Sequence, residues 1–359
     1  MTRPQIRSIF LALLAAVLFG VSAPLGKLLL GEIDPIPLAA FLYLGSGFGL
    51  LLVKLIQRTR KNARHTEAGI QKTDWKWLAG ATLAGGVTAP ILLLFGLRHT
   101  PAATASLLLN FEGVATTLIA ALVFKEFVSR RAWWAILMIT LASILLSLNF
   151  NSTWGFSIGA LGILAACLMW GLDNNFTRNI SAKDPIVIVM VKGLGAGTFS
   201  LFLAWVLQNP FPPLRIAAGA LLLGSISYGL SITLFILALR GLGAARTSAL
   251  FATAPLAGIA LSYVLFRENT GILFLLALPL MAAGTAFLVY EKHEHRHTHE
   301  AFTHDHAHMH DDGHHDHAHQ DAVPLHESHS HEHQHTALQH DHAHMPDIHH
   351  RHQHDTKAE

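Results

Sequence analysis

The sequence predicts an all-α integral membrane protein of ten transmembrane helices, arranged as two inverted five-helix repeats and followed by a disordered tail. Three observations support this fold class: a deficit of charge, a series of long apolar segments, and an internal repeat. Charged residues are 13% of the 359 residues, against about 25% in ordinary soluble domains. Hydrophobic residues are 52%. This composition indicates a chain that lies mostly in a lipid bilayer.

The net charge of +2 conceals two oppositely charged parts of the chain. Residues 1–290 carry 21 Lys and Arg against 9 Asp and Glu, whereas residues 291–359 carry 4 against 14. A basic body fits a membrane protein with positive cytoplasmic loops, and we expect no binding of nucleic acid. The single Cys167 rules out an intrachain disulfide and thiolate metal chemistry.

Ten segments are apolar over roughly the 20 residues that a helix needs to cross the hydrocarbon core. The first is too long for the apolar region of a signal peptide, so we expect it to remain in the protein. The predicted spans are 9–30, 37–57, 76–97, 102–124, 132–149, 157–177, 185–207, 216–239, 245–266 and 271–290.

Basic residues are distributed unequally between the two sides that these spans imply. Fifteen Lys and Arg lie on one side and three, Arg98, Arg215 and Arg267, lie on the other. The positive-inside rule then places both termini and the tail in the cytoplasm. The protein is predicted to be a multi-pass protein of the cytoplasmic (inner) membrane.

The two halves of the apolar body match each other at an offset of 142 residues. Leu97-Arg98 aligns with Leu239-Arg240, and Phe124-Lys125-Glu126 aligns with Phe266-Arg267-Glu268. Between them, residues 102–106 align with residues 244–248. Each unit holds five spans, and an odd number forces the second unit to insert upside down, as in secondary transporters. The predicted parts are a first repeat at 1–149, a second repeat at 150–290 and a histidine-rich tail at 291–359.

These features together resemble the EamA family of the drug/metabolite transporter superfamily. The marks are Trp170-Gly171 in the first span of a unit, an Arg-linked turn after the third span, and Glu126 and Glu268 before Gly/Ala-rich fifth spans. The resemblance covers about 9–290 and excludes the tail. It implies ten helices, alternating access and transport of small solutes, often by export, and it implies no enzyme activity.

The sequence departs from that family in the fourth span. The family usually has a Ser-Pro-like pair midway along the fourth span of each unit. The second unit has Ala254-Pro255, whereas the first has Glu112-Gly113. A carboxyl group at this position favours proton or cation handling over a generic organic solute.

Glu112 is therefore the leading candidate for transport or coupling. An ionisable group near the middle of a span costs about 3 kcal/mol or more, so it normally faces a cavity or a partner. A carboxyl group in a medium of low dielectric constant holds its proton more tightly than in water, which suits proton coupling. The same group could bind a cation directly, and the alternative is a protonated, hydrogen-bonded structural Glu.

Further polar residues in the spans are candidates beside Glu112. Lys192 could pair with Glu112 or Asp173, bind an anionic group, or extend to the membrane interface. Asp173 and Asn174 lie near the cytoplasmic end of their span, where Asp173 and Thr177 share a face. They form a cytoplasmic gate or an ion-loading site, or else an ordinary polar helix end. The remaining candidates are Trp170, Asn110, predicted to contact another helix, and Tyr228, which could line a cavity with Ser231.

Residues 291–359 hold 24 of the 26 histidines. Most are spaced i, i+2, which scatters side chains around a helix, so the tail is predicted to be disordered. Imidazole with interleaved carboxylates suits Zn, Ni, Co or Cu(II), with binding lost as imidazole protonates. The candidate ligands are His293, His295, His297, His299, His304, His306, His308, His310, His314, His315, His317, His319, His329, His331, His333, His335, His340, His342 and His344.

Three functions fit these features. The first is proton-coupled efflux of a divalent metal such as Ni, Co or Zn, with the tail collecting or sensing the ion. The second is export of an organic metabolite, such as an amino acid, nucleoside or drug-like molecule, with the tail as a metal buffer. The third is a membrane-anchored metal sensor that transports nothing, which the intact repeat disfavours.

Overall fold

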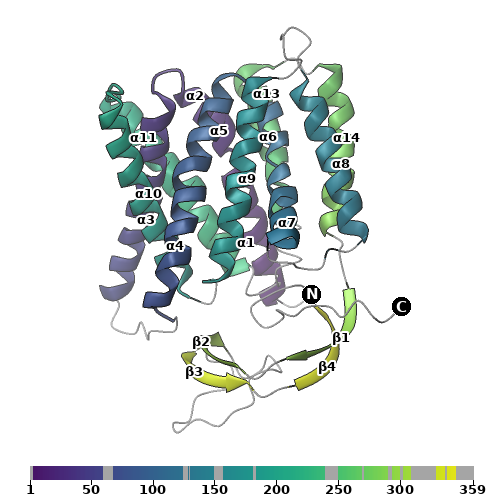
Figure 1. The fold of residues 1–359 in the computed structure, drawn as a ribbon. Helices are drawn as coiled ribbons and strands as arrows, with labels where there is room; N and C mark the ends of the chain where they lie inside the picture. Colours follow the sequence, from purple (N-terminus) through teal and green to yellow (C-terminus); the bar gives the residue numbers. More distant parts are fainter. Residues whose placement is uncertain are drawn as a thin grey trace.

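The computed structural model describes most of the apolar body and four short segments of the tail. The described residues are 3–59, 68–123, 128, 130–148, 157–180, 183–238, 250–268, 271–289, 293–299, 302–308, 329–335 and 338–344. The body is all-α, as predicted, and its helices run side by side in one bundle (Figure 1). Helix α1 begins, and α14 ends, at the end of the bundle that we call the tail end; the opposite end is the far end.

Helical residues occur in each of the ten predicted spans. The first half contains α1 (Arg3–Gly20), α2 (Ser22–Leu29), α3 (Pro35–Thr59), η1 (Lys72–Asp74), α4 (Trp75–Ala81), η2 (Thr82–Thr88), α5 (Ala89–Arg98), α6 (Ala102–Leu108), α7 (Phe111–Val123) and α8 (Arg130–Ser147). The second half contains α9 (Ile158–Arg178), α10 (Pro185–Val206), α11 (Leu214–Gly224), η3 (Ser225–Leu230), an unlabelled helical stretch at 231–238, α13 (Ala254–Phe266) and α14 (Ile272–Val289).

Six helical stretches of the described chain are long and apolar enough to cross a membrane. They are Ile6–Leu29, Pro35–Gln57, Lys72–Arg98, Ala102–Val123, Pro185–Val206 and Leu214–Ala238. Shorter apolar helices occupy Trp133–Ser147, Ala254–Phe266 and Ile272–Phe287. The chain is thus a multi-pass membrane protein, whereas the number of ten crossings stays a prediction.

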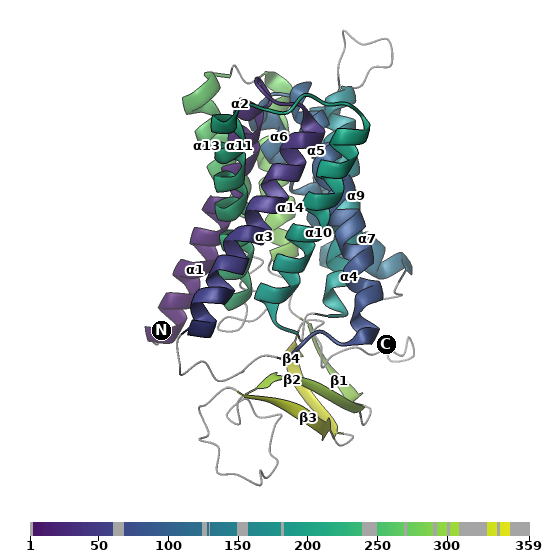
Figure 2. The same ribbon diagram turned by 90° about the vertical axis from the view of Figure 1, so that its left-hand side faces the viewer.

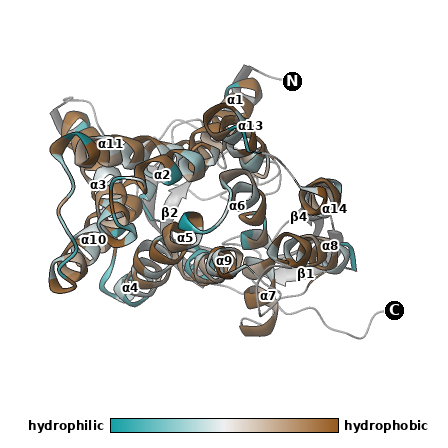
Figure 3. Cartoon of the chain, turned by 90° about the horizontal axis from the view of Figure 1, so that it is seen from above, coloured by the Kyte–Doolittle hydropathy of each residue, from teal (hydrophilic) through white to brown (hydrophobic). Residues whose placement is uncertain are grey.

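The outer surface of the bundle is apolar. Leu122, Leu214 and Val264 are each more than 70% exposed, and hydrophobic residues dominate the rim of the bundle seen from above (Figure 3). Water would make such a surface costly, at about 25 cal/mol per Å² of apolar area. Lipid removes that cost, so the exposed side chains are consistent with the low charge of the sequence.

Two π-helical segments interrupt the spans at corresponding places in the two halves. The segment η2 covers Thr82–Thr88, and η3 covers Ser225–Leu230. Adding the offset of 142 to residues 82–88 gives 224–230, which includes all of η3. A π-helical turn leaves the regular hydrogen-bond ladder and is frequent at functional sites. The agreement between the two segments supports the predicted repeat.

Two further breaks also correspond. Leu109 and Asn110 separate α6 from α7, and Ala252 and Thr253 precede α13. The two breaks are 143 residues apart, one residue more than the offset of 142. Each interrupts the predicted fourth span of its unit, and discontinuous helices of this kind accompany substrate and ion sites in secondary transporters.

Two glycines, Gly20 and Gly171, lie where helices cross. A Cβ on Gly20 would overlap the Ala254 carbonyl of α13, and a Cβ on Gly171 would approach the backbone of Ala115 in α7. Both glycines are therefore needed for a close backbone approach. They place α1 against α13 and α9 against α7, at the starts of the two half-helices that follow the breaks.

The tail contains strands where disorder was expected. The strands are β1 (His293–His299), β2 (Phe302–His308), β3 (His329–His335) and β4 (Leu338–His344), and Figure 2 draws them at the tail end of the bundle. Antiparallel pairs form between β1 and β4 and between β2 and β3. The i, i+2 spacing of the histidines matches the two-residue period of a strand, and disorder of the tail as a whole stays a prediction.

Candidate functional site

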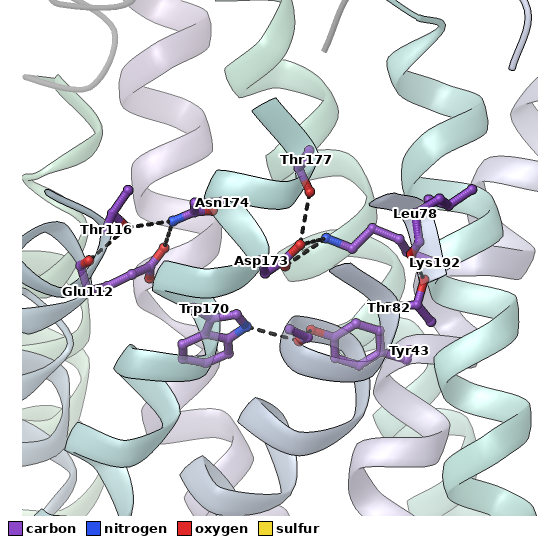
Figure 4. A network of polar contacts seen from close by, with 11 residues as sticks. Tyr43, Leu78, Thr82, Glu112, Thr116, Trp170, Asp173, Asn174, Thr177 and Lys192 are labelled. Carbon is purple, nitrogen blue, oxygen red and sulfur yellow. Dashed lines mark hydrogen bonds and ion pairs between the residues drawn. The ribbon is translucent and has the colours of Figure 1, made fainter. Parts of the chain in front are cut away.

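The candidate site lies on α9, between the broken helix α6–α7 on one side and η2 and α10 on the other. Figure 4 shows the side chains that meet there, which come from α3, α4, η2, α7, α9 and α10. Helix α9 contacts α7, η2 and α5 along its length. The site is thus built from both halves of the chain, as the predicted inverted repeat requires.

The carbonyl of Gly85 in η2 is the first fixed point of the site. It accepts hydrogen bonds from the Tyr43 hydroxyl at 2.6 Å and from the Trp170 indole Nε1 at 3.0 Å. Both side chains are buried. The π-helical turn leaves a carbonyl available to side chains, and these donors tie η2 to α3 and α9.

A buried ion pair is the second fixed point. The Lys192 ammonium lies 2.6 and 2.7 Å from the two carboxylate oxygens of Asp173, with side-chain exposures of 15% and 9%. The Thr177 hydroxyl donates to Asp173 at 2.9 Å, so these residues share a face as expected. Of the partners expected for Lys192, the structure selects Asp173. A Cβ on Gly85 would overlap the Asp173 carboxylate, so this pair requires glycine there.

Glu112 lies in the first turn of α7, directly after the break. Its carboxylate accepts a hydrogen bond from the Asn174 amide at 2.9 Å, and the same amide lies 3.1 Å from the Thr116 hydroxyl. Asn174 is exposed and Glu112 is half-buried. Glu112 therefore has a neutral partner, in contrast to Asp173, which is neutralised by Lys192.

The two remaining predicted residues, Asn110 and Tyr228, have different surroundings. Asn110 forms the break itself, with its backbone N–H donating to the Leu107 carbonyl at 3.2 Å. Tyr228 in η3 is buried, and its ring contacts Phe19 at 6.0 Å and Tyr43 at 5.5 Å between centroids. Ser231, expected beside it, donates instead to the Ala15 carbonyl at 2.8 Å.

Sequence reasoning missed Tyr43 and the Gly85 carbonyl. Tyr43 is one of four tyrosines in the chain, and a phenol in an apolar span needs a hydrogen-bond partner when buried. That signal was available. The role of Gly85 was not, because a π-helical turn has no marker in the local sequence.

Metal ligands do not gather in the described body. Among the side chains that the structure describes, no three of His, Cys, Asp and Glu could hold an ion together. In the tail, the strand register places histidine opposite histidine at six positions: His293 and His344, His295 and His342, His297 and His340, His304 and His333, His306 and His331, and His308 and His329. His310, His314, His315, His317 and His319 lie outside the described residues.

The apolar bundle, its paired helix breaks and its internal polar cluster define a helical membrane transporter. The chain belongs to the EamA-like transporter family, which it matches over residues 6–148 and 157–290. It is 29% identical over 290 residues to a protein of Methanothermobacter thermautotrophicus named an uncharacterized transporter, covering 77% of this chain and 84% of that protein.

A solved crystal structure of a protein also resembles this fold. It superposes with a TM-score of 0.55 over 78% of this chain and 94% of its own, at 16% identity. At this identity the likeness shows the fold alone. The family membership supports a transporter of some small solute across a lipid bilayer.

Proposed function

We propose that the protein is a proton-coupled secondary transporter and that Glu112 takes up and releases the coupling proton. The observation that carries this proposal is the contrast between the two carboxylates of the site. Asp173 is held by the Lys192 ammonium on both of its oxygens. Glu112 has the neutral amide of Asn174, so protonation of Glu112 breaks no ion pair.

The position of Glu112 supports the same role. The carboxyl group follows a helix break, and its partner Asn174 is exposed. Polar and ionisable groups within membrane spans normally face the bundle interior or a water-filled path, because lipid contact is costly. The first turn of α7 also presents backbone N–H groups that favour an anion nearby. A proton and a cation can thus compete for one carboxylate.

The first candidate cargo is a divalent metal ion such as Ni, Co or Zn, exported from the cell. The histidine register of the tail supports it, because opposed residues of an antiparallel pair lie close enough for their side chains to interact. Imidazole is a preferred ligand for Zn, Ni and Cu(II). In this proposal the tail collects or senses the ion, and Glu112 binds it or exchanges it for protons.

The second candidate cargo is an organic solute, and the aromatic side chains favour it. Phe19, Tyr43 and Tyr228 form a connected ring cluster, and the Gly85 carbonyl links Tyr43 to Trp170. Aromatic faces bind organic cations and flat molecules by cation–π contact and stacking. A carboxylate beside such a cluster suits an organic solute that carries a positive charge. The tail then acts as a metal buffer.

We further propose that the tail end of the bundle faces the cytoplasm, in the cytoplasmic membrane. The 15 basic residues predicted on that side against three on the other support this orientation. In this orientation, an exporter would meet its cargo on the side of the tail.

Proton flux in inverted vesicles tests the proposal for both cargoes. Vesicles with an imposed pH gradient are offered nickel, cobalt and zinc, then amino acids, nucleosides and organic cations, and loss of the gradient and uptake of labelled solute are followed. The intact chain should exchange protons for one of these classes, and Glu112→Gln should abolish the exchange. The class that responds decides between metal and organic cargo.

Two further variants serve as controls. Glu32→Gln removes a carboxylate that pairs with Arg215 at the far end, with exposures of 47% and 75%, and it should transport normally. Truncation after Tyr290 measures whether the tail tunes affinity or is essential. Full proton exchange by Glu112→Gln would refute the coupling role of Glu112.

A further inference from the structure

A carboxylate of the second half caps a helix of the first half at the far end of the bundle. The two oxygens of Glu268 accept hydrogen bonds from the backbone N–H groups of Ala102, at 2.7 Å, and Ala103, at 2.9 Å. The first N–H groups of a helix have no partner within the helix, and Pro101 before α6 supplies no side-chain cap. Glu268 therefore satisfies two donors of α6 from across the bundle.

The charge of Glu268 strengthens this contact. Hydrogen bonds from N–H groups to a carboxylate are shorter and stronger than neutral ones, and a negative charge is favoured at a helix N-terminus. The Lys27 ammonium donates to the carbonyl of Thr100, two residues before the start of α6, so a positive charge lies at the same end of the bundle. Segments that are remote in the sequence thus meet at one carboxylate.

The residue before Glu268, Arg267, has an unfavourable backbone conformation. Arg267 ends α13 in the left-handed region, at φ 50° and ψ 40°. A residue with a Cβ pays about 1–2 kcal/mol there, and such outliers persist where the surroundings require them. The left-handed turn at the end of α13 places the next residue, Glu268, against the start of α6.

Below this contact, α6 and α13 pack closely. A Cβ on Gly258 of α13 would overlap Ser106 of α6. Ser106 is 1% exposed. Opening the far end between these helices would expose Ser106, and it would first require Glu268 to leave the two N–H groups.

We propose that Glu268 is a releasable latch that holds α6 to α13 and keeps the far end of the transporter closed in this state. Its purpose rests on the transport function proposed above, because a transporter that alternates must close one end while it opens the other. The sequence repeat pairs Glu268 with Glu126, which lies outside the described residues. Glu126 is predicted at the tail end and offers a matched control.

Cysteine labelling tests the latch without any cargo. In the full chain with Cys167→Ala, Ser106→Cys is the reporter, and its rate of reaction with a membrane-impermeant maleimide applied from the far side is measured. Glu268→Gln should raise that rate about tenfold, which corresponds to roughly 1.4 kcal/mol. Glu268→Asp, which keeps the charge on a shorter side chain, should give a smaller rise, and Glu126→Gln should give none.

Equal rates for Glu268→Gln and the parent would overturn the latch, and so would an equal rise with Glu126→Gln. Cys167 is buried, so in a chain without the reporter its labelling reveals unfolding. If Glu268→Gln exposes Cys167, then Glu268→Asp is used as the test variant. An unchanged labelling rate of the reporter in Glu268→Asp would also overturn the latch. A faster reporter in a chain that moves no tested solute would support the latch and count against the transport proposal.

Discussion

Removing one partner of the Asp173–Lys192 ion pair should destabilise the protein far more than removing both. In Lys192→Met the Asp173 carboxylate keeps Thr177 as a donor but loses its countercharge, while it remains 9% exposed. An uncompensated buried charge costs about 3–5 kcal/mol. Asp173→Asn should cost a similar amount because it strands the Lys192 ammonium, which is 15% exposed.

The double variant should cost no more than either single variant, since it leaves neither charge unpaired. The coupling energy of the cycle should then be about 3–5 kcal/mol or more, which is large for a residue pair. The free energy of unfolding can be followed in detergent micelles by tryptophan fluorescence as a denaturing detergent is added. The exposed Glu32–Arg215 pair, treated by the same cycle, should give about 0–1 kcal/mol. Additive effects of Asp173→Asn and Lys192→Met would refute the structural reasoning.

Three further predictions follow from other features. Gly85→Ala should cost about 1–3 kcal/mol of unfolding free energy, because its Cβ would displace Asp173, whereas Gly219→Ala, whose Cβ meets only ordinary contact, should be neutral or stabilising; equal costs would contradict the close approach. Tyr43→Phe should cost about 1 kcal/mol because Gly85 loses one of two donors, and an unchanged free energy of unfolding would count against that bond. Metal bound per chain, measured by equilibrium dialysis, should fall between pH 7.5 and 5.5, because neutral imidazole binds metal and its ordinary pKa is about 6.5; truncation after Tyr290 should remove the pH-dependent fraction, and pH-independent binding would exclude histidine ligands.

The sequence predicted the helical body well because the signals for it are strong and local. Long apolar runs, sparse charge and the aligned Phe-[Lys/Arg]-Glu ends were enough to place helices in each predicted span. The sequence could identify Glu112, Asp173 and Lys192 as candidates. A charged group within a span is costly and therefore normally has a functional or structural role. That Lys192 would choose Asp173 over Glu112 could not be derived, because the choice depends on how α9 is rotated between its neighbours.

Other parts of the site depend on tertiary geometry, which no single residue in the sequence indicates. The Gly85 carbonyl lies in a π-helical turn, where it accepts hydrogen bonds from side chains of α3 and α9. In the tail, the strand segments were not among the expectations, because the histidine spacing was compared only with the period of a helix. The contact between Glu268 and Ala102 joins residues 166 positions apart, so it could not be predicted from the local sequence.

The matching positions of η2 and η3 carry information about the history of the chain. A residue inserted into one half after the halves were joined would have given that half a widened turn without a counterpart in the other. The widened turns instead coincide at the same offset that relates the flanking segments. The predicted duplication of a five-helix unit would produce this coincidence if the irregular turn already existed in that unit.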